Sequence, residues 1–192
     1  RPSNQLKRII AGITSSLVNC IGSEKEKFTF KDFLVSIAYN FPLENNDWDW
    51  VDGMKEGTLT LEELLAPGCH STFKFLIDTQ QPYYWNNSKE DAKREHRYHY
   101  NKQDELNEEN SEAVGSIFCY NSKIKQGKNT FVNAFLSIST TKKRFSVENK
   151  IIIDNTRDNM ISLIKDSFGK RIGIELCLLY LEYLREHRNK KY

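Results

Sequence analysis

The sequence predicts a helix-rich α+β fold with an N-terminal helical hairpin, a small β-sheet or hairpin, and two C-terminal helices. Near both ends of the chain, apolar residues recur at three- and four-residue steps, the period of an amphipathic helix. Between them, β-branched and aromatic residues flank short polar turns, which favours strands. A chain of 192 residues can bury about 70% of its unfolded surface, so we expect a single globular domain over residues 1–192.

The composition excludes several classes of protein. Apolar residues make up 39% of the chain and charged residues 28%, values typical of a globular protein rather than a disordered or fibrous one. The longest apolar run, residues 172–184, contains Glu175 and Glu182 and is shorter than the roughly 20 residues that cross a bilayer, so no membrane partner is expected. Arg1 in place of an initiator Met is typical of a fragment or a processed form.

Charge and cysteine spacing indicate the kind of partner and the compartment. The net charge of +2 is too small to steer a polyanion, so binding to nucleic acid would depend on local patches. Acidic residues gather at 44–52 and basic residues at 142–144 and 185–191, which predicts two faces of opposite sign. The cysteines form no Cys-x-x-Cys pair, which favours a reduced intracellular protein, cytoplasmic or nuclear, over one with two disulfides. They are Cys20, Cys69, Cys119 and Cys177.

The N-terminal hairpin is predicted from two apolar stripes. The first helix covers residues 4–21 and stops at Gly22. Its stripe consists of Leu6, Ile9, Ile10, Ile13, Leu17 and Ile21. Thr29 followed by Asp32 is a helix-capping pattern, so a second helix is predicted from there to Pro42. Its stripe consists of Phe30, Phe33, Leu34, Ile37 and Phe41.

Short elements are predicted next. Residues 43–57 are rich in Asn, Asp and Gly and indicate a loop. Thr60 with Glu63 makes a capping box for a short helix that Pro67 ends. Residues 71–78 alternate in part and suit a pleated surface, so they are predicted to form a strand.

The second half of the chain begins with a polar helix predicted over residues 88–110. The run at 107–112 is expected to be solvated and is the best candidate for an internal domain boundary. Residues 131–139 and 145–153 flank the basic turn 140–144 and together predict a β-hairpin, although the first run would serve equally in a short helix.

Two helices are predicted to close the chain. Thr156 caps the first, which Gly169 ends, and its apolar face contains Met160, Ile161, Ile164 and Phe168. The apolar face of the last helix contains Ile172, Leu176, Leu179, Tyr180, Tyr183 and Leu184.

Function is expected in residues 83–102, the basic-aromatic segment. It combines five aromatic residues, five Lys or Arg and two of the four histidines, and it is not expected to be buried because it has few aliphatic residues. Aromatic faces stack on bases and cations contact phosphates, so we predict binding to RNA or single-stranded nucleic acid. The predicted contacts are Tyr83, Tyr84, Trp85, Arg94, Arg97, Tyr98 and Tyr100, with Lys142, Lys143 and Arg144 as a second contact.

Within that segment, Arg94-Glu-His-Arg-Tyr-His99 resembles the arginine–histidine motif of HEPN-type ribonucleases. The resemblance implies that Arg94 and His99 are catalytic residues, that they meet those of a second copy at a dimer face, and that they cleave RNA without a metal. The arginine would stabilise the phosphate and the histidine would move the 2′-hydroxyl proton. Glu95 departs from the small polar residue usual in the family. A solvated helix face explains the same residues, so enzymatic activity stays open.

A metal site is a further alternative. His96 and His99 lie three residues apart and could share a helical face, with His70 or Cys69 as a distant third ligand. Exposed histidines without a fixed carboxylate are more often simply solvated. No metal and no cofactor are therefore expected.

Two acidic patterns also point to cations. Residues 52–63 resemble an EF-hand calcium loop, but Met54 stands where an oxygen ligand is needed, and a capped turn explains the same residues. Asp47, Asp49 and Asp52 are compatible with a nuclease metal site, although no Glu-x-Lys strand accompanies them.

The three tryptophans, Trp48, Trp50 and Trp85, lie in segments that read as loops. Large aromatic side chains in loops either anchor the loop to the core or present a binding surface, and anchoring is the favoured interpretation. The alternative to nucleic-acid binding is a protein-interaction module of a larger assembly, which would bind a protein partner or self-associate.

Overall fold

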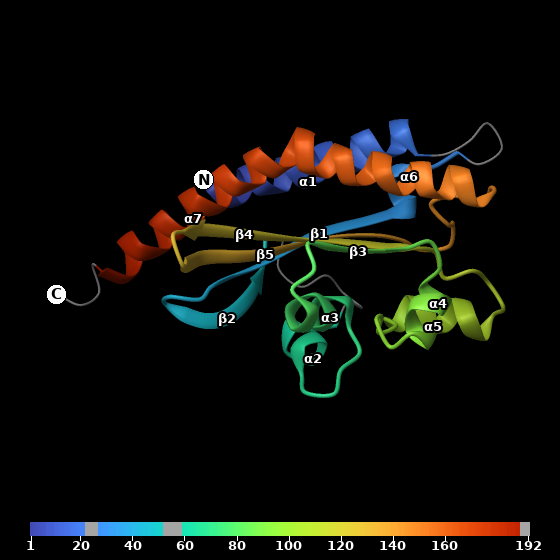
Figure 1. Cartoon of the computed structure of the whole chain (residues 1–192), viewed down its shortest axis with the longest axis horizontal. Helices are drawn as coiled ribbons and strands as arrows, with labels where there is room; N and C mark the ends of the chain where they lie inside the picture. Colours follow the sequence, from blue (N-terminus) through green and yellow to red (C-terminus); the bar gives the residue numbers. More distant parts are fainter. Residues whose placement is uncertain (22–26, 52–58, 189–192) are drawn as a thin grey trace.

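The computed structural model of this chain describes residues 1–21, 27–51 and 59–188. Helices lie on both sides of a central sheet, which is seen edge-on in Figure 1. The α-helices are α1 (Pro2–Cys20), α2 (Leu61–Leu65), α3 (Thr72–Thr79), α4 (Lys89–Arg94), α5 (Lys102–Glu109), α6 (Lys150–Ser162) and α7 (Gly169–Arg188). A 3₁₀ turn, η1 (Phe30–Asp32), precedes the sheet, and a π-helical segment, η2 (Leu163–Phe168), joins α6 to α7.

The sheet has five strands, and every neighbouring pair is antiparallel. The strands are β1 (Phe33–Phe41), β2 (Asn45–Trp50), β3 (Tyr83–Asn86), β4 (Ile117–Gln126) and β5 (Asn129–Thr140). Their spatial order is β2-β1-β5-β4-β3, so β5 lies at the centre between β1 and β4, while β2 and β3 form the edges. The helix-rich α+β class predicted from the sequence is confirmed.

One hydrophobic core lies between the sheet and a layer formed by α1, α6 and α7 (Figure 1). The apolar stripe of the N-terminal helix is buried there, and Leu6, Ile13 and Leu17 are fully enclosed. Ile172 and Leu176 of α7 enter the same core from the other end of the chain. The N-terminal helix and the C-terminal helices are therefore confirmed.

A second core lies on the opposite face of the sheet, beneath which α2, α3, α4 and α5 are arranged (Figure 1). Ala38, Cys119 and Phe135 contribute to it from the sheet, and Phe73 and Leu76 contribute from α3. The sheet is thus covered by helices on both faces.

The second helix of the predicted hairpin is wrong, because residues 33–41 form β1. The capping pattern is real, since Asp32 Oδ2 accepts a hydrogen bond from the Thr29 backbone N–H at 2.6 Å, but it caps only η1. Ile37 enters one core and Ala38 the other, as expected of a strand between two layers. Such a strand has a continuous apolar run, which a helix can show equally well.

Residues 71–78, predicted as a strand, belong to α3. The Ser71 hydroxyl caps this helix by accepting a hydrogen bond from the Lys74 backbone N–H at 3.1 Å. Phe73 and Leu76 lie three residues apart and are both buried, so the helical period fits their burial better than alternation does.

The strand at 131–139 is confirmed as part of β5, but its predicted hairpin partner at 145–153 is wrong. β5 forms its hairpin with β4 through the turn at Gly127 and pairs with β1 along its other edge, so both edges are occupied. The chain instead enters α6, where Asn149 Oδ1 accepts a hydrogen bond from the Ile152 N–H at 3.2 Å and caps the helix.

The helix cap predicted at Thr156 and the helix stop predicted at Gly169 are also wrong. Thr156 lies inside α6, where its hydroxyl donates to the Ile152 carbonyl at 2.8 Å. Gly169 has helical dihedral angles, and η2 carries the chain without a break into α7. Ile164 and Ile172 on either side of Gly169 are buried, so core packing continues through a residue that often ends helices.

Several local features complete the fold. The segment 43–57, predicted as a loop, contains the edge strand β2, and its residues 52–57 lie outside the described residues. The capping box is confirmed, because the Glu63 N–H donates to the Thr60 hydroxyl at 3.1 Å and α2 ends before Pro67. All four cysteines carry free thiols.

Gly115 tests how closely the chain packs where it enters β4. Its φ is +81°, and a side-chain Cβ there would overlap the carbonyl oxygen of Thr140. We expect Gly115→Ala to lower the free energy of unfolding by at least about 3 kcal/mol in urea titrations. Gly127→Ala is the matched control, because Gly127 also has a positive φ but open space around it, and it should cost only about 1 kcal/mol. Equal losses would contradict the close packing.

Candidate functional site

The basic-aromatic segment forms β3, α4 and the loop that leads to α5. The predicted helix over 88–110 is therefore two short helices, broken where His96 adopts a positive φ of 57°. Ser88 caps α4, with its hydroxyl accepting from the Asp91 N–H at 3.2 Å. The solvated connection predicted at 107–112 is partly wrong, because Asn107 is buried and donates to the Thr141 carbonyl at 2.8 Å.

The expectation that this segment cannot be buried is wrong. Tyr84, Ala92 and Tyr100 are buried, and the other aromatic side chains of the segment pack against one of the two cores. Tyrosine allows this because its ring is apolar while its hydroxyl needs only one polar partner. The five aromatic residues therefore serve the fold rather than forming an open stacking surface.

Lys89 and Asp104 form the polar centre of the segment. Lys89 Nζ lies 2.8 Å from Asp104 Oδ1, and both side chains are almost completely buried. The Tyr98 hydroxyl donates to Asp104 Oδ2 at 2.8 Å, and the Asn101 backbone N–H lies 3.2 Å from the same oxygen. The pair thus fixes the start of α4, the start of α5 and the loop between them as one unit.

Burial shifts the proton equilibria of this unit. It lowers the pKa of the Lys89 ammonium, while the neighbouring Asp104 carboxylate opposes that shift. It raises the pKa of the Tyr98 hydroxyl well above its usual value, and Asp104 adds to the increase. Tyr98 therefore remains a hydrogen-bond donor at neutral pH.

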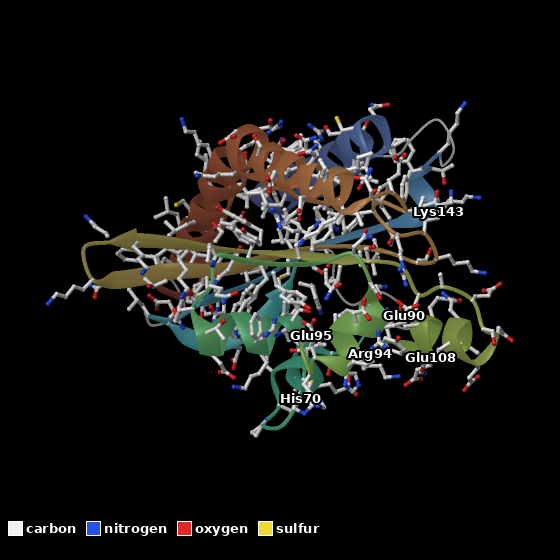
Figure 2. The ribbon with its side chains drawn as sticks, turned by 45° about the vertical axis from the view of Figure 1, so that its right-hand side comes forward. His70, Glu90, Arg94, Glu95, Glu108 and Lys143 are labelled. Atoms are coloured by element: carbon white, nitrogen blue, oxygen red, sulfur yellow. The ribbon has the colours of Figure 1, made fainter. Side chains whose placement is uncertain are left out.

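The cations predicted to contact nucleic acid each lie beside a carboxylate. The pairs are Arg94 with Asp91, Arg97 with Glu95, Lys142 with Glu112, Lys143 with Asp32, and Arg144 with Glu90. Arg97 also lies over the Phe75 ring, 4.7 Å from its centroid. Figure 2 shows Lys143 above the sheet, where it pairs with Asp32 just before β1, apart from Arg94 in the helical layer below the sheet. These side chains form an exposed surface of mixed charge rather than one basic patch.

The predicted catalytic residues lie on different elements. Arg94 is the last residue of α4, and His99 follows in the loop after the turn at His96. Both are exposed, but Arg94 pairs with Asp91 whereas His99 lines a pocket beneath the sheet. The ribonuclease interpretation depends on a second copy and stays a prediction.

The histidines form a pair that differs from the one predicted. The His70 and His96 rings lie 4.6 Å apart between their centroids, while His99 lines the pocket. Within the described ranges, no group of three or more His, Cys, Asp or Glu side chains is placed to hold a metal ion. Most of the calcium-loop candidate, including Asp52, lies outside those ranges.

The tryptophans anchor strands rather than loops. Trp48 stacks on Phe135 with the ring centroids 5.0 Å apart, and Trp50 lies 5.8 Å from Phe73. Trp85 of β3 lies 6.1 Å from Phe145. The predicted anchoring role is confirmed.

The pocket is the feature that sequence reasoning missed. Its volume is about 110 Å³, and it lies between the sheet and the layer that contains α2 and α3. Three serines of the central strands line it: Ser36 of β1 faces Ser137 of β5, and Ser139 lies two residues further along β5 on the same face. We call it the serine-floored pocket.

Apolar side chains surround this floor. They belong to Leu34, Trp50, Leu59, Leu64, Phe73, Tyr98 and Ile117. His99 also lines the pocket and is exposed, so it lies at the mouth. Among the described residues, the three floor hydroxyls have no side-chain hydrogen bond, which leaves them free to bind a guest.

One sequence signal could have indicated this pocket. Ser36 interrupts an apolar run in β1, and Ser137 and Ser139 do the same at alternate positions in β5. Small residues on one face of a strand leave space above the sheet. The signal becomes visible only when β1 and β5 are known to be neighbours.

Comparisons of this chain with protein-family models, with curated proteins and with solved structures give no match. Among the helices of the described ranges, none has the length and apolar character needed to cross a bilayer.

The Lys89–Asp104 pair can be tested against an exposed pair of the same length. Lys93 Nζ lies 2.8 Å from Glu108 Oε2, but both side chains are about half exposed. We expect Lys89→Met to lower the free energy of unfolding by about 3–5 kcal/mol, because it leaves the Asp104 carboxylate buried without its cation. Lys93→Met should cost no more than about 1 kcal/mol. Similar losses in urea titrations of the two variants would show that the buried pair does not hold the fold.

Proposed function

We propose that this protein binds a small organic molecule in the serine-floored pocket. The observation that carries the proposal is the combination of apolar walls with a floor of hydroxyls that have no side-chain partners. Ligand sites have this composition, because apolar walls supply affinity and a few polar groups fix the orientation.

The size of the pocket limits the ligand. An enclosed protein cavity of about 150 Å³ accepts benzene, so a pocket of about 110 Å³ that opens at His99 suits a single small ring or a short branched chain whose outer end lies at the mouth. The floor hydroxyls favour a guest with a hydroxyl, carbonyl or amide group at the buried end. His99 at the mouth can donate or accept a hydrogen bond to the outer end.

The wall of the pocket is held in place before any ligand arrives. Tyr98 lines the pocket while its hydroxyl is fixed by Asp104, and Asp104 is fixed in turn by Lys89. Thr72, another lining residue, donates to the Arg97 carbonyl at 2.8 Å. A preorganised wall lowers the entropy cost of binding.

Phenol and benzene test the proposal as probes that differ by one hydroxyl. We expect both to cause saturable shifts of the Ser36 and Trp50 amide resonances in ¹H–¹⁵N spectra. Phenol should bind roughly two- to twelvefold more tightly, because a net hydrogen bond contributes about 0.5–1.5 kcal/mol.

The control for these titrations is a pair of substitutions on β5. Ser137→Leu fills the floor and should abolish binding of both probes, whereas Thr130→Leu, near the β4–β5 turn, should bind them like the parent. The proposal fails if neither probe saturates the parent, or if Ser137→Leu binds as the parent does.

Binding of RNA or single-stranded nucleic acid stays a second, separate prediction. If it holds, replacing Arg94 and Arg97 together with Ala should weaken RNA binding several-fold at low salt, and the parent should release RNA as salt rises. Fluorescence anisotropy with a labelled oligonucleotide measures this. No binding by the parent at low salt, or equal binding by the double variant, would exclude it.

A further inference from the structure

Helix α7 is apolar on two opposite faces. Its inner face enters the core through Ile172 and Leu176. Its outer face carries Ile174, Leu178 and Leu181, which are 60%, 45% and 58% exposed. At about 100° per residue, these three side chains point roughly 180° away from the inner face. We call them the outer stripe.

The outer stripe has the spacing of a helix that pairs with another helix. Its residues are four and then three positions apart, which is the alternation of d, a and d positions in a coiled coil. α7 lies in the outer layer of the fold and runs along the sheet (Figure 1), so a partner helix can approach it without disturbing the core. Single exposed apolar residues are common on protein surfaces and need no explanation. Three large aliphatic side chains in one row form a patch, which is typical of an interaction surface.

Charges beside the stripe distinguish the two orientations in which two copies could pair. In a parallel pair, Lys170 of one copy lies opposite Glu175 of the other, five residues further along, and the contact occurs twice. In an antiparallel pair, Glu175 and Glu182 would face the same two positions of the other copy. Parallel packing joins opposite charges, whereas antiparallel packing joins like charges.

These side chains are free to make such contacts. No ion pair within the described part of the chain engages Lys170, Glu175 or Glu182. Arg171 and Arg185 occupy the a positions at the two ends of the stripe, where in a parallel pair each faces its own counterpart, so their repulsion limits the length of the contact.

We propose that two copies of this chain associate through the outer stripe, with their α7 helices side by side and parallel. The occupant of the stripe is thus the same stripe of a second copy. Such a short row of apolar contacts buries less area than a permanent dimer does, so the association should be reversible and dependent on protein concentration.

Sedimentation equilibrium of the whole chain between about 10 μM and 1 mM tests the surface. We expect the parent to shift from monomer to dimer within this range and Leu178→Glu to remain monomeric. Leu106→Glu is the matched control, because Leu106 is 51% exposed on α5 and lies outside the outer stripe, and it should dimerise like the parent. A monomeric parent throughout, or a Leu178→Glu variant that still dimerises, overturns the proposal.

Cysteine cross-linking tests the direction, in a chain whose Cys20, Cys69 and Cys177 are replaced by Ser. In the parallel pair, Ile174 faces its own counterpart, so Ile174→Cys should form a disulfide-linked dimer under mild oxidation. In an antiparallel pair, a positions face d positions, so Leu178 would face Leu181 instead. A disulfide that forms only when the Leu178→Cys and Leu181→Cys proteins are mixed overturns the parallel arrangement.

Discussion

The buried ion pair between Lys89 and Asp104 is the constraint on which the lower half of the molecule depends. Two charges removed from water are tolerated only when each finds its partners, and here Tyr98 and the Asn101 backbone complete the shell around the carboxylate. The pair joins α4 to α5 and holds the connecting loop against the sheet. Because Tyr98 lines the serine-floored pocket, the same interaction that stabilises this layer also shapes its cavity.

The two faces of the sheet differ in packing: one is filled by a continuous core and the other contains the pocket. Leu136 and Ile138 alternate along β5 with the pocket serines and therefore point to the opposite face of the sheet. There they pack against α1 and α7 in a continuous core. On the other face, Ser137 and Ser139 are too small to fill the space beneath them, so the strand that builds the core on one side leaves a cavity on the other. The cavity follows from the side-chain period of two in β5.

The expectation that the basic-aromatic segment cannot be buried gave way to a structural role. Its aromatic rings are packed, and its cations stand beside carboxylates, because a polar sequence can be buried when its buried charges find partners. The surface that remains outside is of mixed charge. The cavity and the exposed apolar surface of this protein lie elsewhere. The cavity is the pocket beneath the sheet, and the apolar surface is the outer face of α7.

Local sequence determined the α+β class, the N-terminal helix and the capping box at Thr60, because each depends on periodicity or on contacts between close neighbours. Tertiary structure decided the rest. Residues 33–41 became a strand because β2 and β5 flank them and both faces are covered, a condition that no local pattern records. The serine-floored pocket was likewise invisible in the sequence, since Ser36 and Ser137 are separated by about a hundred residues and meet only when β1 pairs with β5.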